Sequence, residues 1–423
     1  MRLLWFFTAI SLGAETRTLT LKQAVDLALE QSPDIILARL DEVKANQAVR
    51  AARDPFIPKL YVGSGLAYTY GFPMSIDGSA PSLIQARAAA SIFDKTKSLK
   101  VAEERENART ARIGSEGKRE EVAERVAMAY LDADRASRLA RVAAKQIDAL
   151  TQVVEATKVR VTEGRAIRLD EMKAELERER ARERARLLES DARFAQTQLS
   201  LLIGGSADDR VETSAELAPL IGLPDSEAAA VRMALDNSNE LKRLQSIMLA
   251  QGFSLQTERA ARLPKIELVA QYNLFARFNN FDQYFNRFQA NNGQVGMSFQ
   301  LPVLGGTAPG AASATALAEI SRLRTEVGRV RNRTSYETQR AFQAVTNAER
   351  ARELTRLELE VQRENVAVTL ARQESGRATM AEVEQARFAE GERWLTYYDS
   401  QTQLERAKVA LLRWSGSLLV ALR

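Results

Sequence analysis

The residues that could carry chemistry are limited first by what the chain lacks, since it contains no cysteine and no histidine. This excludes thiol nucleophiles, imidazole bases, disulfides and the usual ligands of zinc and copper. Residues 305–310 have the outer glycine spacing of a phosphate loop, but Ala311 and Ala312 follow where lysine and a hydroxyl residue are needed. We interpret this stretch as a turn between a strand and a helix.

Carboxylate pairs do not indicate an acid–base site either. Glu120 and Glu121 are adjacent, so their side chains point apart on a helix. Residues 177–186 are rich in glutamate and arginine, which is typical of a solvated helix face. The chain has 60 basic and 55 acidic residues of interspersed sign, so nucleic acid is not an expected partner. We predict a protein that is not an enzyme and has no catalytic residues, metal site or cofactor.

Two short motifs remain, and each has a glycine, an arginine directly after it, and an acid six residues after the glycine. The motifs are Gly164, Arg165 and Asp170, and Gly376, Arg377 and Glu382. Five residues correspond to about 500° of helix, so the arginine and the acid of one motif cannot pair well on one helix. We expect either partners on neighbouring helices or acids that favour the positive N-terminal ends of the helices that follow.

These motifs belong to a duplication of the chain. Residues 164–166 recur as residues 376–378, and Gly204 recurs as Gly416, at an offset of 212. Nearer the N-terminus the offset is 206, and it relates Ala24, Val25, Ala28, Leu29, Ser32, Arg53, Pro58 and Lys59 to Ala230, Val231, Ala234, Leu235, Ser238, Arg259, Pro264 and Lys265. A repeat of this length is too long for a solenoid unit, so each half is predicted to be a complete structural motif.

Helical periodicity occupies most of each half. The predicted helical segments are residues 21–53, 95–163, 165–202, 226–262, 310–375 and 377–414. Pro33 is expected near a turn or at the start of a second helix. The long segments would reach about 100 Å at 1.5 Å per residue. In each half the two shorter segments together match the long one in length, which predicts short helices stacked end to end beside a long helix.

After the first helical segment of each half the period changes to two. Apolar residues alternate with polar ones at Ile84, Ala86, Ala88, Ala90 and Ile92, and again at Ile266, Leu268, Ala270, Tyr272 and Leu274. Two-faced strands of about ten residues are typical of a lipid-facing barrel. Aromatic residues stand beside the hairpin tips, as in an interfacial girdle, at Tyr68, Tyr70, Phe72, Phe278, Phe281, Tyr284, Phe285 and Phe288. A soluble sandwich is the alternative.

The first residues favour a secretory signal peptide. Arg2 precedes an uncharged run, and Ser11 and Gly13 are small residues at the positions required for a cut after Gly13. A wrongly assigned start codon or a buried N-terminal strand is the alternative. The predicted organisation is a signal peptide (1–13), a first repeat (14–204, strands 59–93, helical hairpin 95–204), a linker (205–225), a second repeat (226–416, strands 264–303, helical hairpin 310–416) and a C-terminal tail (417–423).

In the order of its predicted helices and strands, and in their duplication, the sequence resembles the TolC-like outer-membrane efflux proteins. The resemblance covers nearly the whole mature chain and rests on the paired helix openings, the prolines before the strands (Pro58, Pro264), the glycine–acid turns and the helix-ending glycines. It implies a mainly α-helical fold with a membrane β-barrel portion. Three chains would form a homotrimer whose 12-stranded barrel continues as an α-helical barrel in the periplasm, and twelve strands suffice for a water-filled pore.

The resemblance also implies a function and partners. The protein would be the exit duct of a tripartite efflux or type I secretion system in the outer membrane of a Gram-negative bacterium, extending into the periplasm. Its partners would be outer-membrane lipid, a periplasmic adaptor (membrane fusion protein) and an inner-membrane pump, which decides the cargo. A periplasmic coiled-coil structural or adaptor protein without its own pore is the alternative. Heptads alone would fit that alternative, whereas four alternating strands would not.

The glycine turns are the expected functional sites, because they are the ends of the helical hairpins farthest from the strands. We predict a gate at Asp170 and Glu382, with Arg165 and Arg377 holding the periplasmic mouth closed and the acids favouring cations. Adaptor contacts are expected at the turn residues Gly164, Arg165, Gly376 and Arg377. The family commonly has an apolar residue or threonine after the turn glycine, where this chain has arginine, so the adaptor's identity does not follow from the resemblance.

Overall fold

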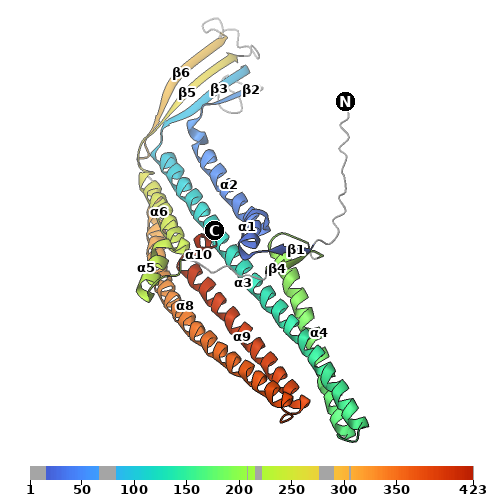
Figure 1. Ribbon diagram of the computed structural model, residues 1–423. Helices are drawn as coiled ribbons and strands as arrows, with labels where there is room; N and C mark the ends of the chain where they lie inside the picture. The colour runs from blue at the N-terminus through green and yellow to red at the C-terminus, as the bar shows by residue number, and fades with distance from the viewer. Residues whose placement is uncertain are drawn as a thin grey trace, which may run out of the picture. The chain divides into compact units, whose positions relative to one another are not determined.

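A computed structural model describes residues 16–65, 82–206, 208–214, 222–275, 290–303 and 306–422 (Figure 1). The chain divides into two compact units. The helical unit consists of Met1–Ala38, Ser115–Asn239 and Val330–Arg423, and the sheet unit consists of Arg39–Gly114 and Glu240–Arg329. The predicted signal peptide and the eight aromatic residues of the predicted girdle lie outside the described residues.

The helices are α1 (Leu21–Gln31), α2 (Pro33–Arg53), α3 (Lys95–Thr162), α4 (Arg168–Leu202), α5 (Glu227–Asn237), α6 (Asn239–Ala260), α8 (Ala308–Glu374), α9 (Met380–Trp414) and α10 (Leu418–Ala421). A 3₁₀ turn, η1 (Asp54–Phe56), follows α2. Pro33 is the first residue of α2, a position where its missing N–H breaks no helical bond, so the predicted helix start is confirmed. Across the described ranges, none of the helices has a stretch apolar enough to cross a membrane.

The sheet unit contains a four-stranded antiparallel sheet in the order β2-β3-β5-β6. Its strands are β2 (Lys59–Gly65), β3 (Ser82–Phe93), β5 (Lys265–Phe275) and β6 (Asn291–Gln300). Each repeat supplies one hairpin, as predicted, and β3 pairs with β5 to join the repeats at the centre of the sheet.

The register between β3 and β5 aligns the two faces that the sequence predicts. Ala88 pairs with Ala270, whereas Gln85 pairs with Asn273. Directly paired residues lie on the same face, so apolar residues share one face and polar residues the other. Side chains of the apolar face are exposed in the single chain, among them Leu60 (69%), Val62 (67%), Val295 (79%) and Met297 (73%). β2 and β6 stand at the two edges of this sheet.

The helical unit has an apolar core built around Tyr130 of α3, which is completely buried. The core also includes Val126, Leu199, Leu412 and Leu418. Burial of these side chains is the main stabilising contribution to this unit.

Two short strands in this unit were not predicted. β1 (Thr16–Leu19) pairs in parallel with β4 (Arg210–Thr213). β4 lies inside the predicted linker, residues 205–225. The hydroxyl of Tyr130 donates to the carbonyl of Leu19 at 2.9 Å and accepts from the N–H of Ser214 at 3.0 Å. Four-residue strands give too little periodicity to recognise. The expected C-terminal tail likewise contains α10, whose Leu418 is buried in the core.

Candidate functional site

The predicted site lies at two turns, one between α3 and α4 and one between α8 and α9, which are found at the lower ends of both helical hairpins in Figure 1. Gly164 has a φ of 72° and Gly376 a φ of 73°, a conformation that residues with a side chain rarely adopt. In the first turn the N–H of Arg165 donates to the carbonyl of Arg160 at 2.8 Å, and the second turn repeats this bond at 2.7 Å. A Cβ at either glycine would meet nothing within 4 Å, so the backbone conformation, not space, requires glycine.

The arginines that follow the two glycines differ in their surroundings. Nη1 of Arg165 lies 3.4 Å from the carboxylate of Glu163, and the arginine side chain is 74% exposed. Arg377 forms no ion pair with any described residue. Neither arginine contacts Asp170 or Glu382, and no hydrogen bond or ion pair within the described chain joins the two turns. The expected links across helices therefore stay a prediction about the assembled protein.

Both predicted gate acids contribute to the N-termini of the returning helices. Oε2 of Glu382 accepts hydrogen bonds from the N–H of Thr379 at 2.6 Å and from its hydroxyl at 2.9 Å, and the hydroxyl in turn accepts from the N–H of Glu382 at 3.3 Å. This is a complete capping box. Asp170 accepts from the N–H of Ile167 at 3.3 Å, but Ile167 has no side-chain acceptor, so only half of the box forms.

The hydrogen bonds at Glu382 also affect its protonation. The backbone N–H of Thr379, followed by its hydroxyl, lowers the pKa of the Glu382 carboxyl, because both stabilise the carboxylate form. Glu382 is therefore negatively charged at neutral pH. A charged acid beside an exposed turn is compatible with both roles considered from the sequence, the helix cap and the ring of charge around a pore.

Ion pairs connect the middle of α3 to the C-terminal half of α9. Nη1 of Arg413 lies 3.0 Å from Glu120, and its Nε lies 3.4 Å from Glu124. Burial raises the pKa of the Glu124 carboxyl, and the charge of Arg413 opposes that shift. Further pairs are Arg135 with Asp399, at 2.6 Å, and Arg406 with Asp132. Sequence reasoning missed these contacts because the partners are far apart along the chain.

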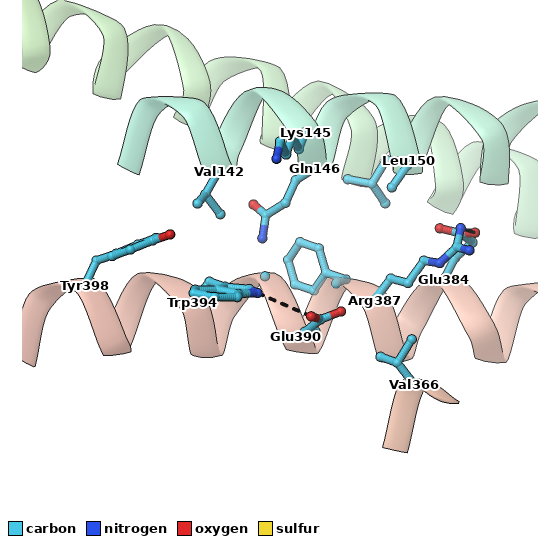
Figure 2. Close-up of a pocket in the computed structure, with 13 residues that line it drawn as sticks. Val142, Lys145, Gln146, Leu150, Val366, Glu384, Arg387, Glu390, Trp394 and Tyr398 are labelled. Atoms are coloured by element: carbon cyan, nitrogen blue, oxygen red, sulfur yellow. Dashed lines mark hydrogen bonds and ion pairs between the residues drawn. The ribbon is translucent and has the colours of Figure 1, made fainter. Parts of the chain in front are cut away.

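Closer to the turns, α3 and α9 border a groove of about 550 Å³ (Figure 2). Figure 2 shows Gln146 pointing from α3 toward α9, where the indole N–H of Trp394 donates to Glu390 at 3.3 Å. Nε2 of Gln146 is buried and has no hydrogen-bond partner within the described chain. On α9, Glu384 accepts from Arg387 at 2.9 Å through one carboxylate oxygen, while the other is buried without a partner.

Buried polar atoms without a hydrogen-bond partner occur both in the groove and in the ion-paired part of the same interface, where Nε of Arg406 and Nε of Arg413 have none within the described chain. No periodic pattern or motif in the sequence indicates this groove. The one available indication was Gly391, a glycine inside a helical pattern, which often has a packing reason. Neither the turns nor the groove offers a metal site, since the described part of the chain has no group of three or more His, Cys, Asp or Glu residues that could hold a metal ion.

Comparison with known proteins gives a consistent result. Residues 24–205 match the model of the outer membrane efflux protein family. Among solved structures, CusC is 15% identical with a TM-score of 0.77, covering 96% of this chain and 95% of its own. The Campylobacter jejuni outer membrane channel CmeC is 12% identical with a TM-score of 0.77, covering 94% and 86%. The open state of the Neisseria gonorrhoeae outer membrane channel MtrE is 14% identical with a TM-score of 0.72, covering 94% and 89%.

No curated protein matched the sequence. The structural likenesses extend over both repeats, whereas the family match covers the first repeat. Together they confirm the predicted family resemblance and the predicted mainly helical fold with its sheet portion. CmeC and MtrE, two of the solved structures that the chain resembles, are outer membrane channels.

Proposed function

Because residues 24–205 match the model of the outer membrane efflux protein family and the chain has a fold similar to that of outer membrane channels, we propose that this protein is the exit channel of a tripartite efflux or type I secretion system. The observation that carries the proposal is the two-faced sheet. Its apolar face is exposed in a single chain, and both of its edges are open. An isolated sheet of this kind is an aggregation hazard in water.

A barrel made from three chains removes both problems. The β6 edge of one chain pairs with the β2 edge of the next, which gives twelve strands and leaves no open edge. The apolar face then contacts lipid. The polar face, where Arg87 pairs with Gln271 and Gln85 with Asn273, lines a water-filled lumen.

The glycine turns are proposed as the gate and as the docking site of the adaptor. Each turn is exposed, is fixed by its own backbone hydrogen bonds, and presents an arginine and an acid. In a trimer the turns occur three times each, so links from Arg165 and Arg377 to neighbouring chains would close the mouth. Such exposed links are weak individually, about 0.2–1 kcal/mol, so the closed state depends on their number. The adaptor and the pump select the cargo.

The test is insertion and conduction by the full-length protein. We expect a detergent-extracted trimer whose mobility on a gel changes on heating, and discrete conductance steps after its addition to planar lipid bilayers. The alternative, a periplasmic coiled-coil protein without a pore, predicts release by osmotic shock in soluble form and no conductance. A soluble monomer would therefore overturn the proposed function.

A further inference from the structure

A groove of about 540 Å³ lies within the sheet unit, between α2 and α3, and arginine dominates its lining. The basic lining residues are Arg53 from α2 and Arg105, Arg109 and Arg112 from α3. Glu42 is the single acid of that lining, and Asn46, Val49 and Ala108 complete it. All four arginines are exposed, so a solute can reach them without any rearrangement of the chain.

The arginines of α3 share one face of the helix. Arg105, Arg109 and Arg112 follow each other at spacings of four and three residues, which places neighbouring side chains on the same side. Guanidinium groups stay charged at all physiological pH values, so this arrangement is repulsive unless an anion compensates it. This repulsion cannot be relieved by titration, unlike the repulsion within a histidine cluster.

The chain itself supplies little compensation to Arg53, Arg105 and Arg109. Within the described residues, neither Arg53 nor Arg105 forms an ion pair or a side-chain hydrogen bond. The ion pair of Arg109 is with Glu106 at 3.8 Å, and the arginine side chain remains 56% exposed. Other arginines of the sheet unit have closer partners, as in the pair of Arg322 with Glu319 at 2.6 Å.

The fold does not require this cluster, as the second repeat shows. α3 ends at Thr162 and α8 at Glu374, so equivalent positions in the two long helices lie 212 residues apart. Leu317 and Ser321 of α8 consequently occupy the positions of Arg105 and Arg109. The same helical architecture therefore forms without the two central arginines of the groove.

The charge of the sheet unit supports an anionic ligand. This unit holds 22 of the 60 basic residues and only 14 of the 55 acidic ones, so it carries the whole positive excess of the chain. Within a basic unit, an arginine groove attracts anions from a distance, and the concave shape concentrates the field.

We propose that the groove between α2 and α3 binds a phosphate-bearing anion. Guanidinium groups match phosphate oxygens with paired, parallel N–H donors, which gives the strongest charge-assisted hydrogen bonds in proteins. Arg105 and Arg109 form the centre of the site, and Arg53 contacts the anion from α2. The groove is larger than one phosphate group, so the ligand carries two phosphates or a phosphate with an attached polar group. A soluble phosphate compound and a lipid headgroup share this chemistry.

The experiment uses the full-length trimer in a nonionic detergent, with pyrophosphate as the soluble probe in calorimetric titrations at constant ionic strength. We expect saturable binding that the double variant Arg105→Gln, Arg109→Gln weakens at least tenfold. The matched control, Arg322→Gln with Arg329→Gln on α8, removes the same charge from the same unit and should change the affinity less than threefold. The site stands independently of pump and adaptor, so its failure would leave the proposed channel intact.

A second arm distinguishes the two sources of phosphate. The same proteins are reconstituted in nanodiscs of phosphatidylcholine with or without phosphatidylglycerol, and bound lipid is measured by native mass spectrometry. Retention of phosphatidylglycerol that depends on Arg105 and Arg109, without pyrophosphate binding, supports a lipid headgroup site. Pyrophosphate binding that depends on them supports a soluble ligand. The proposal is overturned if the double variant and the α8 control have the same effect on both probes.

Discussion

The side-chain amide of Gln146 on α3 lies directly against Gly391 on α9, so closely that a Cβ at residue 391 would stand 2.3 Å from Nε2. The same Cβ would be 3.1 Å from Cδ and 3.2 Å from Cγ of that glutamine, so rotation of the amide alone would not make room. Gln146 is 8% exposed. The close approach of the two helices beside the groove therefore depends on the missing side chain at residue 391.

We predict that Gly391→Ala lowers the thermal stability of the helical unit. Alanine gains about 1 kcal/mol in helix propensity, but overpacking costs about 1–3 kcal/mol, so the net effect is destabilising. Gly328→Ala in α8 is the control, because a Cβ there meets nothing within 4 Å, and it should stabilise. Adding Gln146→Ala to Gly391→Ala should restore part of the loss. Equal melting temperatures for the two single glycine variants would contradict this packing argument.

The double variant Arg165→Ala, Arg377→Ala should raise the single-channel conductance in planar bilayers. Each exposed link contributes little, so losing one kind per chain only loosens the mouth, whereas losing both opens it. Arg180→Ala on the exposed surface of α4 serves as the control, since its partner is Glu177 on the same helix. Unchanged conductance in correctly assembled trimers would leave the two arginines without a role in closure.

Glu382→Ala should lower cation selectivity, measured from reversal potentials in a salt gradient. Glu382→Gln separates charge from capping, because glutamine also completes a capping box but carries no charge. If the acid acts on permeating ions, both variants lose selectivity, and the alanine variant loses more helix stability than the glutamine variant. Retained selectivity in Glu382→Gln would restrict Glu382 to its structural role at the start of α9.

The stability that Glu382 contributes should depend on pH. Its pKa is lowered in the folded chain, so the folded state holds the carboxylate more strongly than the unfolded state does. The contribution is complete above the ordinary pKa of about 4.5 and is lost as the pH falls through the lowered value. Melting curves of the wild type and of Glu382→Gln should therefore converge at acidic pH. Curves that run parallel down to pH 3 would exclude this linkage.

Substitutions in the strands test which face contacts lipid. Ala88→Arg and Leu274→Arg lie on the apolar face and should impair insertion, because arginine at the bilayer midplane of a barrel costs about 2–4 kcal/mol. Gln85→Arg and Gln271→Arg lie on the polar face and should be tolerated. Outer-membrane fractionation and the yield of heat-modifiable trimer measure insertion. Equal yields from all four variants would refute the assignment of the faces.

The features predicted from the sequence are those with a long periodic signal. The strand faces of β3 and β5 and the bounds of the long helices follow from alternation and helical spacing over ten or more residues. The turn glycines could be identified because the same motif occurs in both repeats.

The features missed depend on contacts between distant segments. No local sequence pattern relates the residues that form these contacts. Examples are the pairing of β1 with β4, the hydrogen bonds of Tyr130 and the ion pairs of Arg413. At the candidate site the sequence indicates two acids near helix starts, but it does not separate a capping role from a gating role. The reason is that an acid near a helix start satisfies both requirements.

The pairing of β3 with β5 has an evolutionary consequence. In a half-length ancestor, this central pairing of the sheet would have formed between two separate copies of one chain. The two paired copies would then have had identical sequences. Fusion makes the contact intramolecular and raises the effective concentration of the two hairpins. Fusion also allows the sequences of the two repeats to diverge. One repeat can then carry the arginine groove while the other keeps Leu317 and Ser321 at the equivalent positions.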